Sequence, residues 1–388
     1  MKFAALPPVR RSVALSRGEA GPYRHAMEQF FGGRPIDLYA SGTAALARSI
    51  TECAARSSTK TPEVILPAYG CPDLITACVS ASVLPRLVDS APGTWTYSPE
   101  ALCSNLSPNT VAIVAVNLLG IGDDSAELSR LCRDRRIPLI QDSAQFLPRA
   151  PEPWPGQYIV LSFGRGKPLS LLHGGALVRT DSSAEVPPTA PAHYSPRDRL
   201  LASRPAAVAF NALTDPHLYW LLLLLPGTGL GEVAYKPLRN SAPLPDRAWR
   251  QVGKAFDLYR RHQSYSRAIW DRALAEWSRA GIEVLNCRGS PPSAEPLRLP
   301  LLAPDRAARD ELVTRLNRAG LGASRLYGTT LDQISGIPEV VRTQGPFRNA
   351  TALADRLFTI PTHTLVTAAA VAATRKVVSE WHRSARRP

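Results

Sequence analysis

The chain has 388 residues, 45% of them hydrophobic and 20% charged, which is typical of a folded protein large enough for two lobes. Its 46 Lys and Arg against 32 Asp and Glu give a formal net charge of +14. Because no recognisable binding motif accompanies this charge, nucleic-acid binding is disfavoured. The charge indicates a solvated basic surface, or attraction of an anionic substrate such as a nucleotide diphosphate, or of an anionic membrane.

The N-terminal residues lack the apolar run of a signal peptide, and no run approaches the roughly 20 apolar residues of a membrane span. We therefore expect a cytoplasmic protein. The cysteines form no CxxC pair, and their spacing fits neither a zinc site nor a disulfide framework. We predict reduced thiols and no bound metal. The cysteines are Cys53, Cys71, Cys78, Cys103, Cys132 and Cys287.

From about residue 37 to 180, strand-like and helix-like segments alternate. Predicted strands cover 36–40, 63–67, 84–89, 111–116, 138–141 and 158–163, and predicted helices cover 43–54, 73–81 and 126–133. Strands that alternate with helices imply parallel crossover connections. The sequence therefore predicts an α/β fold with a mainly parallel central sheet and functional loops at its carboxyl edge.

The remaining chain is less regular. Residues 181–200 are rich in Pro, Ser and Ala and indicate a surface connection, and 246–279 indicates a long helical stretch. Helices are predicted at 306–319 and 368–383, with strands at 297–302 and 358–361. We predict a large domain over 1–245, followed by a linking helix and a smaller C-terminal α/β domain over 246–388.

An apolar segment at about 200–240 contains the run from Leu218 to Leu225. The simplest interpretation is a buried helix. Peripheral contact with a membrane, or cover for an apolar substrate, are the alternatives. The run is much too short to span a bilayer.

Lys167 is the most informative residue. It lies in a Gly-rich segment after an apolar stretch, and Asp142 stands at the end of an earlier apolar stretch. Pyridoxal phosphate (PLP) needs a lysine for its Schiff base and a carboxylate against its pyridine nitrogen. A structural salt bridge is the alternative role for Asp142, whose burial is costly unless it is paired. Together the two residues predict a PLP site.

Other candidates surround this pair. Gly42 and Thr43 open a helix after a strand, where backbone amides bind phosphate, although an ordinary helix cap gives the same pattern. Ser162 is positioned to contact the same phosphate, or it is a half-buried strand serine. Gln145 is placed to hydrogen-bond the phenolic oxygen of the cofactor, or it is a plain surface glutamine.

Seven motifs occur in a fixed order. They are Ser-Gly-Thr-Ala-Ala-Leu (41–46), Val-Ile-Leu-Pro-Ala-Tyr (64–69), Leu-Val-Asp (87–89), Asn-Leu-Leu-Gly-Ile-Gly-Asp (117–123), Gln-Asp-Ser-Ala-Gln (141–145), Ser-Phe-Gly-Arg-Gly-Lys (162–167) and Gly-Gly-Ala-Leu-Val (174–178). This order resembles the DegT/StrS family of PLP-dependent aminotransferases, whose fold is the aspartate-aminotransferase-like fold type I. The resemblance covers about 37–180 and returns weakly at 357–363.

The resemblance implies that Lys167 forms the Schiff base and that Asp142 pairs with the pyridinium nitrogen. It implies that Gln145 binds the ring oxygen and that Gly42, Thr43 and Ser162 bind the phosphate. It also implies a homodimer. The expected reaction moves an amino group from an amino-acid donor, glutamate in relatives, to a keto group of a nucleotide-linked sugar by ping-pong chemistry.

Three positions depart from the family pattern. The aromatic residue that stacks on the cofactor corresponds to Tyr69 or Cys71, and Tyr69 is the better chemical candidate, with a packed core tyrosine as the alternative. His173 stands where an acidic residue commonly precedes the Gly-Gly pair. Asn240 is the candidate for the residue that reaches the phosphate of the neighbouring subunit.

Other functions stay open. The acceptor is a non-sugar or lipid-like ketone or aldehyde if the apolar 218–225 run contacts the substrate. A PLP-dependent dehydratase is disfavoured, because related dehydratases carry histidine in place of the lysine at position 167. A non-catalytic relative would have little reason to retain both Asp142 and Lys167.

Overall fold

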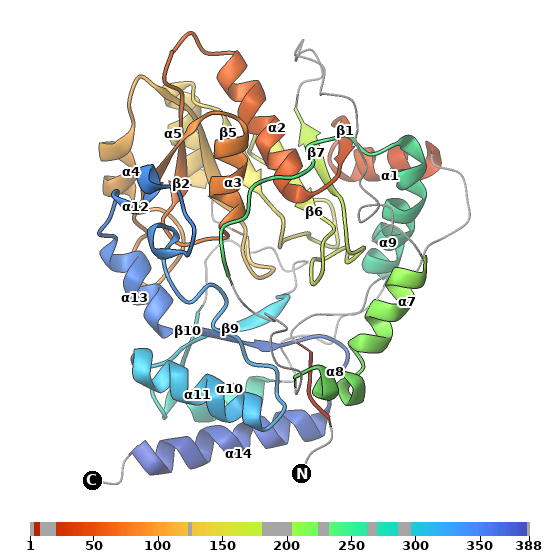
Figure 1. Cartoon of the computed structure of the whole chain (residues 1–388), viewed down its shortest axis with the longest axis vertical. Coiled ribbons are helices and arrows are strands. Elements are labelled where there is room, and N and C mark those ends of the chain that lie inside the picture. Colours follow the sequence, from red (N-terminus) through yellow and green to blue (C-terminus); the bar gives the residue numbers. More distant parts are fainter. Residues whose placement is uncertain are drawn as a thin grey trace.

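The computed structural model describes residues 4–7, 21–122, 126–180, 204–223, 233–261, 270–285 and 296–385. The chain forms a large α/β lobe and a smaller lobe that contains the end of the chain (Figure 1). Among the described residues, no helix combines the length and apolar character needed to cross a bilayer.

The large lobe is built on a seven-stranded sheet of order β1-β7-β6-β5-β4-β2-β3. The strands are β1 (Ile36–Tyr39), β2 (Glu63–Pro67), β3 (Leu84–Val88), β4 (Thr110–Val116), β5 (Leu139–Asp142), β6 (Tyr158–Ser162) and β7 (Gly175–Arg179). Strands β2 to β6 pair in parallel, whereas β7 runs antiparallel to both β6 and β1. The predicted mainly parallel sheet is confirmed, and every predicted strand and helix of this region is present within two residues of its predicted ends.

Helices cover both faces of this sheet, because its strands are apolar on both sides. Along β2, Val64 and Leu66 pack with α2 (Gly42–Ala55) and α3 (Asp73–Ser80), whereas Ile65 packs with α4 (Pro99–Asn105) and α5 (Ala126–Arg135). Helices α1 (Gly21–Phe30) and α9 (Trp249–Arg261) cover the same face as α4 and α5, near β6 and β7. The 3₁₀ turn η1 (Asp246–Ala248) precedes α9.

The smaller lobe has a three-stranded antiparallel sheet of order β10-β9-β8. Its strands are β8 (Glu283–Val284), β9 (Arg298–Leu302) and β10 (Leu357–Pro361), and its helices are α10 (Asp271–Ser278), α11 (Arg306–Arg318) and α14 (Ala368–Ala385). Trp270, Trp277 and Trp381 lie in its core. The described parts of the predicted 246–279 helical stretch are η1, α9 and α10.

Two segments lie across the predicted boundary at 245/246, which itself stays a prediction. Leu6 packs in the core of the smaller lobe, and its N–H donates to the carbonyl of Gly320 at 2.8 Å. Conversely, η3 (Leu331–Gln333), α12 (Glu339–Arg342) and α13 (Arg348–Arg356) contribute residues to the core of the large lobe. An N-terminal segment and a segment of the C-terminal part therefore both help to bind the lobes together.

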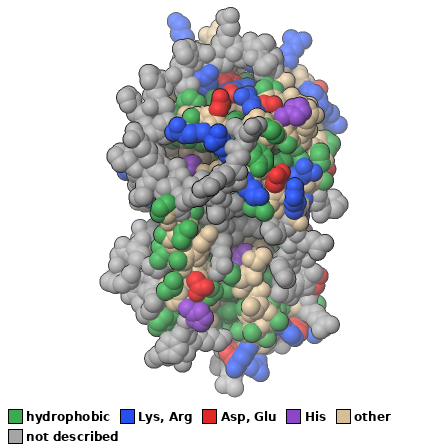
Figure 2. Space-filling model, turned by 90° about the vertical axis from the view of Figure 1, so that its right-hand side faces the viewer, with side chains coloured by type: hydrophobic (Ala, Val, Ile, Leu, Met, Phe, Trp, Pro, Cys, Tyr) green, Lys and Arg blue, Asp and Glu red, His purple; other side chains and the backbone are tan. Residues whose placement is uncertain are grey.

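The apolar 218–225 run was predicted to form a buried helix, and the described part is helical but not fully buried. Helices α7 (Arg204–Leu213) and α8 (Pro216–Leu223) form here, and residues 224–232 lie outside the described ranges. Val208, Leu213 and Leu218 are 66, 45 and 43% exposed, so the prediction of a buried helix is wrong for Leu218. The reason is that both helices lie on the outside of the molecule, where Figure 2 shows apolar side chains on the surface.

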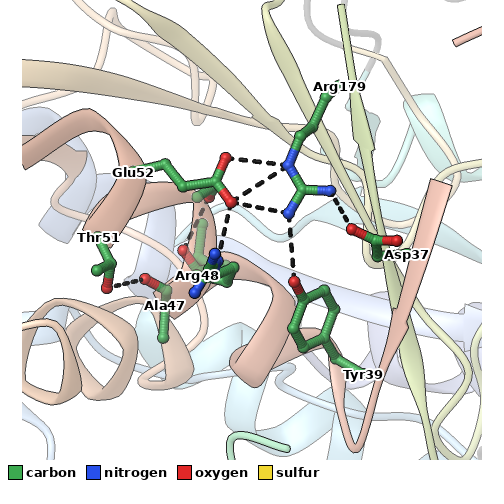
Figure 3. Close-up of polar contacts among 9 residues, drawn as sticks. Asp37, Tyr39, Ala47, Arg48, Thr51, Glu52 and Arg179 are labelled. Carbon is green, nitrogen blue, oxygen red and sulfur yellow. Dashed lines mark hydrogen bonds and ion pairs between the residues drawn. The ribbon is translucent and has the colours of Figure 1, made fainter. Parts of the chain in front are cut away.

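Arg179, at the end of β7, lies in an ionic cluster that joins β7, β1 and α2 (Figure 3), in which Arg179 and Glu52 are buried and Asp37 is exposed. Its guanidinium donates to Glu52 at 2.8 and 3.0 Å, to Asp37 at 2.5 Å and to the Tyr39 hydroxyl at 3.2 Å. Arg48 reaches Glu52 at 2.9 Å. Burial alone would raise the pKa of Glu52, but the hydrogen bonds and charges of Arg179 and Arg48 outweigh burial and lower it.

We predict that Arg179→Met destabilises the protein by about 3–5 kcal/mol at neutral pH, because it leaves the Glu52 carboxylate buried beside Arg48 alone. Denaturant titration measures this. Arg24→Met is the control: the Arg24–Glu28 pair is partly exposed, with side chains 42 and 22% exposed, and is worth at most about 1 kcal/mol. Equal losses in the two variants would contradict the prediction.

The difference between wild type and Arg179→Met should shrink on acidification. A carboxyl whose folded pKa is lowered contributes stability above its unfolded pKa and loses it as the pH falls through the folded value. The double variant Arg179→Met/Glu52→Gln should recover part of the loss at neutral pH, because no charge is then left buried.

Candidate active site

A cavity lies at the carboxyl edge of the large sheet, where β4, β5 and β6 end. Parallel strands bring their carboxyl ends to one edge, so side chains far apart in sequence meet there. The described lining residues are Gly42, Thr43, Leu46, Cys71, Asp73, Val116, Asn117, Leu118, Asp142, Ala144, Gln145, Ser162, Lys167 and Tyr327. Six of the seven predicted site residues are among them.

Gly42 brings the start of α2 directly against the end of β6. Ser41 caps the helix, since its side chain accepts the N–H of Ala44 at 3.0 Å. The first N–H groups of a helix have no acceptor within the helix. The first two residues of α2, Gly42 and Thr43, line the cavity together with Ser162. This arrangement is suited to an anion such as phosphate.

Asp142 ends β5 and is 8% exposed. Burial raises its pKa, while the hydrogen bond from the Ala144 N–H at 3.0 Å and the nearby charge of Lys167 lower it. A buried carboxylate of this kind is best stabilised by a cationic partner. Lys167, in the loop after β6, lies in the same cavity, as predicted.

Gln145 lies on the wall of the cavity, where its side chain makes two hydrogen bonds. Its Oε1 accepts the N–H of Leu119 at 3.3 Å, and its Nε2 donates to the Tyr327 hydroxyl at 2.9 Å. Tyr327 comes from the C-terminal part of the chain. The cavity therefore combines residues of the N-terminal half with one residue of the C-terminal part.

Tyr69 is not brought to the cavity. It is fully buried and packs edge-on against Tyr327, with ring centroids 5.6 Å apart. Cys71, the other candidate for that position, does line the cavity. Burial raises the pKa of the Cys71 thiol to about 12, so it stays protonated at neutral pH. His173 and Asn240 are not among the described lining residues, and the Asn240 side chain accepts the N–H of Ala242 at 2.9 Å.

Sequence reasoning missed Asp73, Asn117 and Tyr327 as lining residues. Asn117 lies inside a quoted motif, immediately after β4, and its position at a strand end was a usable signal. Asp73 is the first residue of α3. Tyr327 has no such signal, because nothing in the local pattern ties it to β4 or β5.

The chain has the fold of PLP-dependent aminotransferases. The PMP form of the putative sugar aminotransferase Spr1654 from Streptococcus pneumoniae superposes with a TM-score of 0.69 over 99% of both chains, at 16% identity.

Residues 20–186 match the model of the DegT/DnrJ/EryC1/StrS aminotransferase family, which is the family that the ordered motifs resemble. Protein MosB of Rhizobium meliloti is 29% identical over 171 residues, which cover 42% of this chain and 32% of that protein. The putative pyridoxal phosphate-dependent aminotransferase EpsN of Bacillus subtilis is 30% identical over 162 residues, 39% of each chain. The chain thus matches well under half the length of these curated relatives.

We predict that Gly42→Ala destabilises the protein by about 1–3 kcal/mol, because a Cβ there would lie 2.7 Å from the Ser162 Cβ and 3.2 Å from its Cα. Thermal unfolding measures this. Gly164→Ala is the control in the loop between Ser162 and Lys167: its Cβ would meet Ser162 Oγ at 3.6 Å and Lys167 Cγ at 3.9 Å. It should change stability by less than about 1 kcal/mol. A well-tolerated Gly42→Ala would disprove the close approach of α2 to β6.

Proposed function

We propose that this chain is a PLP-dependent aminotransferase that moves an amino group from an amino-acid donor, glutamate, to the keto group of a nucleotide-linked sugar. The observation that carries the proposal is the convergence of Lys167, Asp142 and the N-terminus of α2 on one cavity. The names of EpsN and Spr1654 support the cofactor, and that of Spr1654 supports a sugar acceptor.

The cavity residues fit the cofactor chemically. The α2 amides, with the hydroxyls of Thr43 and Ser162, supply donors for a phosphate. Asp142 supplies the buried carboxylate that a protonated pyridine nitrogen would neutralise. Lys167 supplies an amine for the aldehyde. When bound, PLP acts as an electron sink for the amino-acid Cα.

Each residue then has a role in proton handling or positioning. Asp142 would hold the proton on the ring nitrogen, and Gln145 Nε2 would donate to the ring oxygen. The Lys167 amine, once released, would carry the proton removed from the Cα of the donor. The thiol of Cys71, which stays protonated, would serve as a wall of the cavity rather than as a nucleophile.

Two further parts of the proposal rest on the family resemblance. We propose a homodimer, in which a neighbouring subunit completes the phosphate site. The exposed Leu218 supports a lipid-like ketone as a second candidate acceptor. Screening keto sugars against apolar ketones decides between them.

We predict that the purified protein takes up PLP with a visible absorbance, and that borohydride then fixes the cofactor on Lys167. Peptide mass spectrometry locates the modification. Lys167→Ala should abolish fixation but leave the circular dichroism spectrum unchanged. Lys60→Ala, at an exposed surface lysine, should behave as wild type. A protein that takes up no PLP would refute the proposed function.

We predict that glutamate bleaches the visible absorbance in step with release of 2-oxoglutarate, and glutamine should be tested in parallel. Asp142→Asn should slow this half-reaction by about 10²–10³-fold, because it removes the charge that holds the ring proton. Stopped-flow absorbance measures the rate. A protein that binds PLP but responds to no amino-acid donor would rule out aminotransfer, and near-normal rates in Asp142→Asn would rule out its assigned role.

A further inference from the structure

Tyr327 is the one aromatic residue among the described residues that line the cavity. It lies between α11 and η3, far from the motifs that form the rest of the site. Its neighbours Leu326 and Gly328 both have left-handed backbone conformations, with φ of +58° and +72°. This tight turn directs Tyr327 from the C-terminal part of the chain to a site built by the N-terminal half.

The Gln145 amide has a defined orientation only because it contacts two partners. The Leu119 N–H can only donate, so the amide oxygen must face it, at 3.3 Å. The amide nitrogen therefore faces the Tyr327 hydroxyl, 2.9 Å away. An amide nitrogen has two hydrogens, and the second is left to serve the cavity that Gln145 lines.

Tyr327 is held by packing of its ring and by backbone hydrogen bonds of the residues that precede it. Tyr69 packs against it edge-on. The preceding residues are fixed by paired hydrogen bonds between Ser324 and Thr359, at 2.7 and 2.9 Å. Earlier in the same segment, the Gly320 carbonyl accepts the N–H of Leu6. Burial raises the pKa of Tyr327 well above its usual value, so the hydroxyl stays neutral and can both accept and donate.

We infer that Tyr327 is a positioning residue for the cofactor: by accepting the Gln145 Nε2 hydrogen bond, it fixes the amide so that its second N–H meets the ring oxygen. The inference rests on the proposed function, since it assumes PLP in the cavity. It makes the C-terminal part of the chain a component of the cofactor site. Tyr327 acts through Gln145 rather than on the reacting atoms.

The test is a double-mutant cycle on the dissociation constant for PLP, measured by absorbance titration. Tyr327→Phe keeps the ring that packs on Tyr69 and removes only the hydroxyl. It should weaken PLP binding about 3–10-fold, the usual value of one hydrogen bond. Gln145→Ala should weaken binding at least as much. In the double variant, Tyr327→Phe should add less than about twofold, because its effect passes through Gln145.

A spectroscopic readout accompanies the cycle. The visible absorption maximum of bound PLP should shift in the same direction in Tyr327→Phe and Gln145→Ala, because both disturb the same donor to the ring oxygen. Tyr97→Phe is the structural control. Its hydroxyl donates to the Val114 carbonyl at 2.5 Å, away from the cavity lining, so this variant should lower the Tm and leave PLP affinity and spectrum unchanged.

The outcomes distinguish failure of the proposed function from failure of the role assigned to Tyr327. Wild-type protein that takes up no PLP refutes the proposed function. Wild-type protein that binds PLP while Tyr327→Phe has normal affinity and spectrum overturns the inference alone. Fully additive losses in the double variant also overturn it, because Tyr327 would then act independently of Gln145. A Tm loss without a change in affinity would assign Tyr327 a purely structural role.

Discussion

The fixed position of helix α2 is the constraint on which both the core and the candidate site depend. Its first turn is pressed against β6 and β7, where Gly42 and Gly175 leave no room for a Cβ. Its third turn carries Glu52, which is bound by Arg179 from β7. Close steric packing at one end and a buried ion pair at the other give the helix a single position.

The two contacts differ in what they contribute. Replacing a buried ion pair by apolar residues is often neutral in stability, so the Arg179 cluster is better understood as fixing one arrangement than as adding stability. The cluster includes Asp37 and Tyr39 of the edge strand β1 as well as α2. It therefore couples the antiparallel edge of the sheet to the helix whose first residues line the cavity.

Much of the large lobe was predictable, because its signals are local. Short apolar strands alternate with amphipathic helices, and the parallel order then places residues after β4, β5 and β6 at one edge. This reasoning located Asp142, Ser162 and Lys167 together. It failed at Tyr69, which follows β2 and is buried in the core, whereas Cys71, two residues later, lines the cavity.

The contributions of the C-terminal part were not predictable in the same way. Tyr327 reaches the cavity through a turn whose geometry depends on Leu326 and Gly328, and its ring is placed by contacts with distant residues. Likewise, the exchange of segments across residue 245 arises from packing between Leu331 and the core around β2. No periodicity in the sequence reports such contacts.

The net charge of +14 is not accompanied by a positively charged cavity. Its described charged lining residues are Asp73, Asp142 and Lys167, and the α2 amides are assigned to the phosphate of the cofactor. If the acceptor is a nucleotide-linked sugar, its diphosphate must therefore be held outside these lining residues. Many surface arginines are already paired, as Arg315 is with Glu311 and Arg375 with Glu276. The net charge can raise the encounter rate with an anionic substrate, but binding would need arginines or lysines near the cavity entrance or from a second subunit.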